Sequence, residues 1–272
     1  MISDAELKAL MQAIYNRYGL DFTNYETNSL KRGIVRLNMK HKISSLLELW
    51  SKILKDKDFF MQAIDDLMVN LTELFRNPDS WIKIRDTVLI QYEKQAKINI
   101  WHAGCSTGEE VYTMAMVLKD KALLYKTSTL ATDLSRKVLK SAEKGEYSLM
   151  LLNQYLKPFL AYYPNRQMDD FFTFNKVNAT IKDECKKHIT FQKHNLVQDS
   201  MDRKFDIIFC RNVMIYFDEK LKEQVLELFF NSLSDTGYLV IGYYDIMPDK
   251  GKKLFEVFDL KTKIYKRKNI KL

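Results

Sequence analysis

The sequence predicts an α/β fold in which a helical domain precedes a parallel β-sheet with helices on both faces. Up to about residue 70, apolar residues recur only at the three-and-four spacing of amphipathic helices. From residue 97 onward, short apolar runs alternate with helical segments, as in the βαβ units of a parallel sheet. Between about residues 155 and 195 this alternation lapses, which indicates a small inserted β-subdomain. We therefore expect a helical domain at residues 1–75 and a sheet domain at residues 76–272.

Four helices are expected in the first domain, and the second of them should span residues 28–39. Gly19 is suited to end the first helix, since glycine readily adopts the left-handed conformation found there. Ser44 or Ser45 can cap the third, because a serine oxygen accepts a hydrogen bond from a free backbone N–H. The apolar positions of the four helices are Leu7, Leu10, Met11, Ile14 and Tyr18, then Leu30, Ile34 and Leu37, then Leu46, Leu49, Trp50 and Ile53, and finally Phe60, Ile64, Leu67 and Met68.

The second domain should contain the strands of the main sheet and a strand pair in the insert. Each main strand is a short apolar run, and the first ends in small residues and a turn. The main strands are expected at residues 98–101, 128–132, 205–210 and 238–241, with helices around residues 111–118, 138–142 and 219–233. In the insert, residues 171–174 and 188–191 are predicted to pair with each other.

The composition limits the class of protein and of partner. No apolar run reaches the roughly 18–20 residues that span a bilayer, and charged residues interrupt residues 1–20. We therefore expect no membrane insertion, no secretory signal and a cytoplasmic location. The three cysteines and four histidines lack the spacing of a zinc site or a disulfide framework, so no metal is expected. A net charge of +8 favours nucleic acid, an anionic membrane surface or a glutamate-rich protein as partner, or reflects only a lysine-coated surface.

A glycine-containing loop joins the first strand to its helix at residues 101–110. In open α/β sheets, ligands bind at the carboxyl ends of the strands, where Gly104 and Gly108 would let the backbone approach a ligand closely. The spacing of these glycines differs from that of dinucleotide-binding loops and of the P-loop. Glu109 and Glu110 suit the N-terminus of a helix but would repel a phosphate there. A ligand with a positive centre and ribose hydroxyls fits better, which is the chemistry of S-adenosylmethionine.

Asp133 ends the second predicted strand, 25 residues after Gly108. A carboxylate at that place can accept hydrogen bonds from ribose hydroxyls. The alternative role is ordinary helix capping, since aspartate is a frequent N-cap residue. The common position of Asp133 and the two glutamates at one edge of the sheet favours a ligand.

Four segments of the sequence resemble the motifs of the chemotaxis receptor methyltransferases, the CheR family. They are residues 70–76 (Asn-Leu-Thr-Glu-Leu-Phe-Arg), 103–110 (Ala-Gly-Cys-Ser-Thr-Gly-Glu-Glu), 131–133 (Ala-Thr-Asp) and 210–218 (Cys-Arg-Asn-Val-Met-Ile-Tyr-Phe-Asp). Their order and spacing also match, and the resemblance extends from about Leu30 to Lys266. The second and fourth segments are highly specific, whereas the N-terminal match is weak.

The resemblance implies a Rossmann-like class I methyltransferase domain with an all-helical N-terminal domain and a small inserted β-subdomain. It also implies the reaction, in which a methyl group passes from S-adenosylmethionine to glutamate side chains of methyl-accepting chemotaxis receptors. The products would be glutamyl methyl esters, used in sensory adaptation, and S-adenosylhomocysteine. The partner would be the cytoplasmic domain of a receptor, without nucleic acid, and the enzyme would be a monomer.

Site residues also follow from the resemblance, position by position. Arg76 and Tyr216 would be the catalytic residues, beside the methyl group that is transferred. Together with Gly104 of the loop, the cofactor-binding residues would be Asn70, Thr72, Arg76, Glu110, Asp133, Asn195, Leu196, Arg211 and Asn212.

Two positions depart from the family pattern. Val111 follows the glutamate pair where relatives usually have proline, and the late strand ends in Gly242-Tyr243-Tyr244-Asp245 where relatives usually have Gly-His-Ser-Glu. We expect cofactor binding to tolerate both departures. The second changes the rim of the active site and therefore bears on the identity of the substrate.

Methyl transfer to glutamate needs no general base, because a carboxyl group with a reference pKa of about 4.3 is ionised at pH 7. The expected task of the protein is to align the reactants and to remove water. Arg76 could hold the carboxylate of the substrate or of the cofactor, or act only as a cation at a helix end. Tyr216 could donate a hydrogen bond near the attacking oxygen, or serve only in core packing. Cys105 and Cys210 are predicted to be packing thiols, since neither has an activating neighbour in sequence.

Arg32, Arg36 and Lys40 recur at every fourth position of the second predicted helix, on the side opposite its apolar stripe. Such a stripe is either a solvated face or, as the family suggests, a surface that docks onto an acidic receptor. Electrostatic steering of that kind would raise the association rate and depend on salt.

Two other functions remain open from the sequence. A methyltransferase for nucleic acid or amines is compatible with the charge of +8, but the Asn/Asp-Pro-Pro-Tyr/Phe motif is absent from the sequence. A non-catalytic module that senses the cofactor or docks a partner is the second alternative, and the altered segment at residues 242–245 keeps it open.

Overall fold

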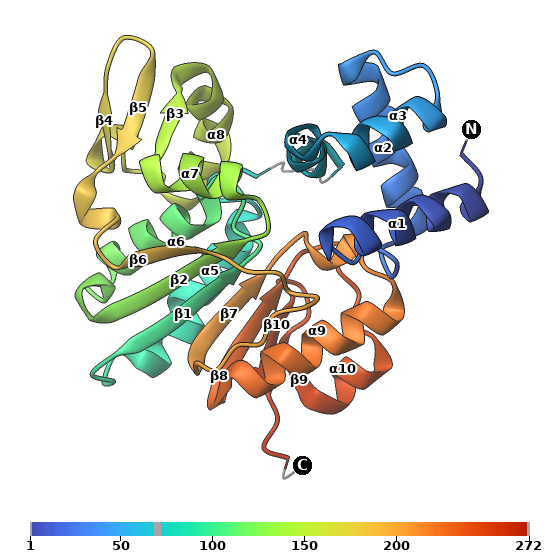
Figure 1. Ribbon diagram of the computed structural model, residues 1–272. Coiled ribbons are helices and arrows are strands. Elements are labelled where there is room, and N and C mark those ends of the chain that lie inside the picture. Colours follow the sequence, from blue (N-terminus) through green and yellow to red (C-terminus); the bar gives the residue numbers. More distant parts are fainter. Residues whose placement is uncertain (1, 68–71, 271–272) are drawn as a thin grey trace. The chain divides into compact units, whose positions relative to one another are not determined.

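The computed structural model describes residues 2–67 and 72–270, and the chain divides into two compact units (Figure 1). The helical unit comprises Met1–Asn70 and Val213–Val225, and the sheet unit comprises Leu71–Asn212 and Leu226–Leu272. Residues 213–225 therefore belong to the helical unit, although in sequence they lie between two strands of the main sheet.

The four predicted helices of the helical unit are confirmed as α1 (Asp4–Tyr18), α2 (Thr27–His41), α3 (Leu46–Lys55) and α4 (Lys57–Leu67). Helix α1 begins with a capping box, in which Ser3 and Glu6 exchange hydrogen bonds. It ends at Gly19, whose φ of 70° is the left-handed conformation expected there. Ser45, rather than Ser44, caps α3. The predicted apolar position Met68 lies outside the described residues.

The returning segment of the helical unit packs against the link between α1 and α2. Tyr25 and Phe217 form an isolated antiparallel bridge, and their rings meet edge to face at 5.2 Å. The backbone N–H of Glu26 donates to the carbonyl oxygen of Tyr216 at 2.8 Å. These contacts fix the backbone of Tyr216 to the start of α2.

The sheet unit is built on a seven-stranded sheet with the order β6-β2-β1-β7-β8-β10-β9. The strands are β1 (Ile98–Ala103), β2 (Thr127–Asp133), β6 (Ile189–Lys193), β7 (Phe205–Cys210), β8 (Leu233–Ile241), β9 (Phe255–Asp259) and β10 (Ile264–Arg267). Strands β6, β2, β1, β7 and β8 run parallel, whereas β10 is antiparallel to β8 and to β9. The predicted parallel sheet is confirmed, and β9 and β10 add an antiparallel edge that was not predicted.

Helices cover both faces of the main sheet (Figure 1). The α-helices described after residue 72 are α5 (Pro78–Lys83), α6 (Glu109–Asp120), α7 (Arg136–Lys144), α8 (Leu149–Tyr162), α9 (Glu219–Ser232) and α10 (Asp249–Leu254). Alternate residues of β1 point to opposite faces: Ile98 and Ile100 join a core with Val117 of α6, whereas the Trp101 ring meets Phe229 of α9 at 5.5 Å. Among the helices of residues 2–67 and 72–270, none has the length and apolar character needed to cross a bilayer.

A second, three-stranded sheet has the order β3-β5-β4 and is antiparallel. Its strands are β3 (Glu146–Ser148), β4 (Phe172–Phe174) and β5 (Asn178–Ile181). The predicted pairing of residues 171–174 with 188–191 is wrong, since β4 pairs with β5. Strand β6 instead extends the main sheet beside β2, where Ile189 and Phe191 pack against the apolar core.

Candidate active site

The carboxyl ends of the parallel strands bring the predicted cofactor residues of the sheet unit to one edge of the main sheet. The loop after β1 begins at Gly104, β2 ends at Asp133, and Arg211 follows β7. Because β2, β1 and β7 are parallel neighbours, these three positions lie side by side.

The loop after β1 is held close to β2 by its own backbone. The N–H groups of Gly104 and Cys105 both donate to the carbonyl oxygen of Thr132, at 2.8 and 2.9 Å. Gly104 and Gly108 have φ values of 84° and 93°, a conformation that glycine adopts without steric cost. A Cβ on Gly108 would approach Ala142 of α7 at 3.1 Å. Helix packing is therefore one reason for this glycine, in addition to the predicted approach of a ligand.

Asp133 ties this loop to the start of α7. Its Oδ2 accepts from the N–H of Ser106 at 2.9 Å, and its Oδ1 accepts from the N–H of Ser135 at 3.0 Å. The N-cap of α7 is Ser135, whose Oγ accepts from the N–H of Val138. The alternative reading of Asp133 as the N-cap is therefore wrong. A carboxylate is the kind of group that accepts hydrogen bonds from ribose hydroxyls, and Asp133 places one beside the glycine loop.

The adjacent residues Glu109 and Glu110 lie in different environments. Glu109 is 1% exposed; its carboxyl group accepts a hydrogen bond from Thr107 Oγ1 at 2.7 Å and lies 3.1 Å from the Tyr155 hydroxyl oxygen. Burial raises the pKa of Glu109, against the effect of these hydrogen bonds. Glu109 is therefore a structural group between the loop and α8. The predicted cofactor residue Glu110 instead contacts His102 and Arg211.

Glu110 is shared by two basic side chains. His102 Nδ1 lies 2.8 Å from its Oε1, and Arg211 Nη1 lies 3.4 Å from its Oε2. Burial alone would raise the pKa of Glu110, but the hydrogen bond and charge of His102, with the charges of Arg211 and Arg76, hold that pKa below its usual value. Glu110 is therefore a carboxylate at neutral pH.

His102 was missed by the sequence analysis. It lies in β1 with a fully buried ring that stacks on Phe209 of β7 at 4.5 Å. Its Nε2 is buried and, among the described residues, has no hydrogen-bond partner. A histidine at an inward position of a buried strand is the signal that could have identified it, since such a group needs a partner.

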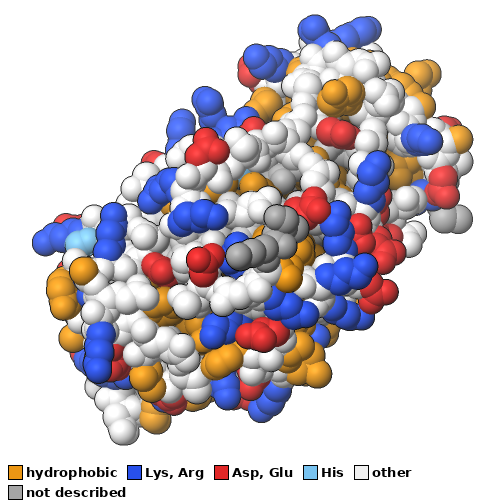
Figure 2. Space-filling view, turned by 90° about the horizontal axis from the view of Figure 1, so that it is seen from below, with side chains coloured by type: hydrophobic (Ala, Val, Ile, Leu, Met, Phe, Trp, Pro, Cys, Tyr) orange, Lys and Arg blue, Asp and Glu red, His pale blue; other side chains and the backbone are white. Residues whose placement is uncertain are grey.

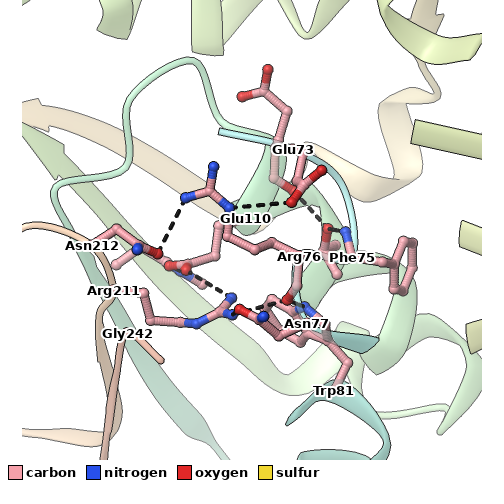
Figure 3. A network of polar contacts seen from close by, with 12 residues as sticks. Glu73, Phe75, Arg76, Asn77, Trp81, Glu110, Arg211, Asn212 and Gly242 are labelled. Carbon is pink, nitrogen blue, oxygen red and sulfur yellow. Dashed lines mark hydrogen bonds and ion pairs between the residues drawn. The ribbon is translucent and has the colours of Figure 1, made fainter. Parts of the chain in front are cut away.

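Arg211 is buried and joins three segments of the chain (Figure 3). Its Nη2 donates to the carbonyl oxygen of Arg76 and to Asn77 Oδ1, both at 2.9 Å, while Nη1 faces Glu110. The guanidinium also lies over the Trp81 ring, 5.4 Å from its centre. Burial lowers the pKa of Arg211, and the Glu110 carboxylate opposes this change. An arginine fork suits this site because it can satisfy several acceptors at once.

Arg76 and Asn212 point toward each other in the same network (Figure 3). Arg76 Nη1 donates to Asn212 Oδ1 at 3.1 Å, and Arg76 Nε faces Glu73 Oε1 at 3.4 Å. The Arg76 side chain is partly exposed, so its guanidinium can also reach a ligand. Arg76, Glu110, Arg211 and Asn212 are therefore brought together, as expected for residues of one site.

Residues 242–245, where the sequence departs from the family pattern, form a tight turn that supports Asn212. Asp245 is 2% exposed, and its Oδ2 accepts from the N–H of Gly242 at 2.7 Å and from the N–H of Asn212 at 3.3 Å. A Cβ on Gly242 would lie 2.6 Å from the Asn212 nitrogen, so only glycine fits there. Asn212 itself has a φ of 60°, a left-handed conformation that asparagine tolerates better than most residues.

The remaining predicted cofactor residues contribute differently. Asn195 is committed to its own turn, where Nδ2 donates to Gln198 Oε1 at 2.6 Å and Oδ1 accepts from the N–H of Val197 at 3.0 Å. Leu196 is partly buried in the same turn, which follows β6. Thr72 offers its carbonyl oxygen to the Tyr155 hydroxyl at 3.1 Å. Asn70 lies outside the described residues.

In the helical unit, Tyr216 and two residues of the predicted basic stripe line one pocket of about 210 Å³. Its lining consists of Ser29, Arg32, Arg36, Ile215 and Tyr216. Arg32 Nη2 donates to Ser29 Oγ at 3.0 Å, and Arg36 Nη2 donates to the carbonyl oxygen of Leu67 at 3.2 Å.

Lys40, the third residue of the stripe, differs from the other two. It is not part of the pocket lining and forms an ion pair with Asp66 at 2.5 Å. The stripe therefore divides into two arginines at a pocket, of which Arg32 also lies 3.8 Å from Glu26, and one lysine outside the pocket that is paired with Asp66.

The cysteines are packing residues, as predicted. Cys105 and Cys210 are fully buried and free, and burial raises the pKa of both thiols well above its usual value.

The donor set of the sheet unit fits S-adenosylmethionine. Glu110 and Asp133 supply carboxylates next to a helix N-terminus, and Arg76 supplies a cation with exposed surface. A zwitterionic ligand with a positive centre and hydroxyl groups matches both signs of charge, whereas a phosphate would meet two carboxylates.

Comparison with known proteins gives the same assignment. Residues 70–264 match the family model described as CheR methyltransferase, SAM binding domain, and residues 5–68 match that described as CheR methyltransferase, all-alpha domain. A relative from Pseudomonas putida named Cher3 is 35% identical over 88% of each chain. The chemotaxis protein methyltransferase of Borreliella burgdorferi is 32% identical over 94% of this chain and 92% of its own, and chemotaxis protein methyltransferase 1 of Vibrio cholerae is 31% identical over 89% of each. The chain therefore belongs to the CheR methyltransferase family and carries its S-adenosylmethionine-binding domain.

Proposed function

We propose that this chain transfers the methyl group of S-adenosylmethionine to glutamate side chains in the cytoplasmic domain of chemotaxis receptors. The products are glutamyl methyl esters and S-adenosylhomocysteine. The chain acts as a monomer in the cytoplasm and without nucleic acid. The relatives named as chemotaxis protein methyltransferases support the substrate, and the network at the edge of the main sheet supports the chemistry.

The observation that carries this proposal is the polar network of Arg76, Glu110, Arg211 and Asn212. Four charged or amide groups from three separate segments converge at the carboxyl ends of β1 and β7. Buried charge is costly unless it is paired, and clusters of buried charged groups with shifted pKa values are frequent at functional sites. Arg211 is buried, whereas Arg76, Glu110 and Asn212 are partly exposed and can reach a ligand.

The residues of the network have distinct roles in this proposal. Bound S-adenosylmethionine supplies an electrophilic methyl group on a sulfonium centre. Glu110 and Asp133 accept hydrogen bonds from the amino-acid and ribose parts of the cofactor. Arg76 binds a carboxylate, Arg211 holds Glu110 in place, and Asn212 orients Arg76. Gly104, Thr72, Asn70, Asn195 and Leu196 complete the cofactor-binding set.

No residue has to remove a proton from the attacking group. The glutamate of the substrate is ionised at neutral pH, so the enzyme gains rate by orientation and by excluding water from the attacking oxygen. Tyr216 is the proposed hydrogen-bond donor near that oxygen.

The pocket of Arg32, Arg36 and Tyr216 is the proposed entry for the substrate glutamate in the helical unit. Two guanidinium groups at one pocket attract a carboxylate. The net charge of +8 is not gathered at one place on the face shown in Figure 2, where Lys and Arg side chains are interspersed with Asp and Glu. Lys40 contributes less in this proposal, since Asp66 neutralises it.

Transfer of tritiated methyl from S-adenosylmethionine to receptor-containing membranes tests the proposed function. Mild base should release the label as methanol, because carboxyl methyl esters hydrolyse under conditions that leave N-methyl groups intact. An Arg76→Ala variant should lose this activity. Base-stable label would assign another substrate, and cofactor binding without transfer would assign a sensing module.

A further inference from the structure

The turn after β8 exposes a small group of apolar side chains. Tyr243 and Tyr244 are 51% and 77% exposed, and their rings meet edge to face at 5.3 Å. Ile246, two residues further on, is 74% exposed. Single exposed apolar residues are ordinary in proteins, but three within four consecutive positions form a patch that a partner can cover.

This patch is anchored to the proposed active site. Asp245 Oδ2 accepts from the backbone N–H groups of both Gly242 and Asn212, and the backbone of Gly242 lies close against that of Asn212. Asn212 in turn accepts a hydrogen bond from Arg76. The backbone of the two tyrosines is therefore fixed relative to the polar network. The same hydrogen bonds fix it relative to Arg76 and to a ligand that Arg76 binds.

The direction of the strands places the patch on the edge of the sheet that carries the cofactor loop. Strand β8 is parallel to β7, which is parallel to β1, and the patch follows the carboxyl end of β8. The opposite edge offers a useful comparison. Tyr125 is 74% exposed and lies just before the amino end of β2, another strand of the same parallel set.

We propose that Tyr243, Tyr244 and Ile246 contact the substrate polypeptide on either side of the glutamate that is methylated. This inference rests on the proposed function and adds residues that select the substrate. Rings of tyrosine supply apolar contact area at a small entropic cost, and their hydroxyl groups can bond to polar atoms of the partner. The fitting partner is a polypeptide segment that presents apolar side chains next to its acceptor glutamate.

The turn at residues 242–245 is held by Asp245 and not by the tyrosine side chains. The tyrosines can therefore contact a substrate without a structural role at the methyl-transfer site. The buried acid of the turn performs the structural task, as its two backbone hydrogen bonds show. The side chains of the two intervening tyrosines face solvent. Substitution of the tyrosines should therefore affect the substrate and leave the cofactor alone.

The test compares a Tyr243→Ser/Tyr244→Ser double variant with a Tyr125→Ser control. Binding of the cytoplasmic domain of a receptor to the enzyme loaded with S-adenosylhomocysteine is measured together with methyl transfer. The double variant should raise the receptor Kd and KM about tenfold, as expected when interface aromatic residues are removed. The Kd for S-adenosylmethionine and the Tm should stay at wild-type values, and the control variant should match wild type throughout.

A Tyr243→Phe/Tyr244→Phe variant separates the two contributions of the rings. It should restore most of the receptor affinity, because it keeps the apolar contact area. An unchanged receptor Kd in the double serine variant would overturn the inference, and so would a joint loss of Tm and cofactor affinity, which would make the turn a purely structural element. Receptor binding by wild type without base-labile methylation would instead reject the proposed function while leaving the binding inference standing. Absence of receptor binding by wild type would reject both.

Discussion

Arg76 and Asn212 lie 136 residues apart in sequence and are joined by a hydrogen bond of 3.1 Å from Nη1 to Oδ1. Asn212 is held for this contact in a left-handed conformation, and Asp245 accepts its backbone N–H. A proposed catalytic arginine is thus oriented by a turn that follows β8. Residues 242–245 of this turn differ from the family pattern in their two middle positions, but the last position is still an acid, Asp245.

Substitution of Asp245 by asparagine should disturb the proposed active site more than the fold. The carboxylate oxygen that accepts two backbone N–H groups would become part of a neutral amide, and a hydrogen bond to a charged group is worth about 1.5–3 kcal/mol. We expect kcat to fall at least several-fold. Initial rates at saturating cofactor measure the effect. Asp249→Asn, at an exposed position, is the matched control, and equal activities of the two variants would contradict the positioning role of Asp245.

Arg211→Lys should weaken cofactor binding although it conserves the charge. A lysine ammonium cannot reach Arg76 O, Asn77 Oδ1 and Glu110 together in the planar arrangement of a guanidinium. We expect the Kd for S-adenosylmethionine to rise about tenfold, which corresponds to about 1.4 kcal/mol. Isothermal titration calorimetry measures it, with Arg203→Lys at an exposed position as control. Unchanged affinity would mean that charge alone is required at this position.

Glu109→Gln should flatten the pH dependence of stability. The folded-state pKa of Glu109 is raised above 4.5, so the folded protein binds more protons than the unfolded chain as the pH rises above 4.5. The free energy of unfolding of wild type therefore falls through this window, and it stops falling above the folded-state pKa. Glutamine does not titrate, so the variant lacks this loss. Its free energy of unfolding, compared with that of wild type at the same pH, should be more favourable at pH 7 than at pH 4.5. Urea unfolding at several pH values measures this, and parallel curves for both proteins would refute it.

The geometry around Glu109 supports the same prediction. The Tyr155 hydroxyl has one proton but lies 3.1 Å from two oxygen atoms, Thr72 O and Glu109 Oε1. If Tyr155 donates to Thr72, a protonated Glu109 can donate to Tyr155, and the amide of glutamine can do the same. Glu109→Gln should therefore retain cofactor binding, whereas Glu109→Ala should lose stability.

The basic stripe of α2 should act mainly through its two arginines. Arg32→Glu combined with Arg36→Glu should slow receptor methylation at low salt, since both line the pocket with Tyr216, and should leave the cofactor Kd unchanged. Lys40→Gln should have a smaller effect, because Asp66 already neutralises Lys40. Methylation rates across a salt series measure the difference. Equal rates for the double variant and wild type at low salt would make the stripe an ordinary solvated face.

Much of the fold could be predicted because local patterns determine it. Helical periodicity located α1 to α4, and apolar runs located β1, β2, β7 and β8. The pairing of short strands was not predictable in the same way, since a run such as residues 188–191 carries no information about its partner. It joined β2 because burial of Ile189 and Phe191 in the main core outweighs pairing within the insert.

The sequence by itself determined the family motifs, the acidic glycine loop and the nature of the ligand, because residue types and spacings over a few positions define them. Only the tertiary structure decided which of two adjacent glutamates joins the polar network. Successive residues of a helix point about 100° apart, so Glu109 entered the core beside Tyr155 and Glu110 met His102 and Arg211. The roles of His102 and Asp245 were likewise decided in space, since their partners come from distant segments that only packing of the sheet brings together.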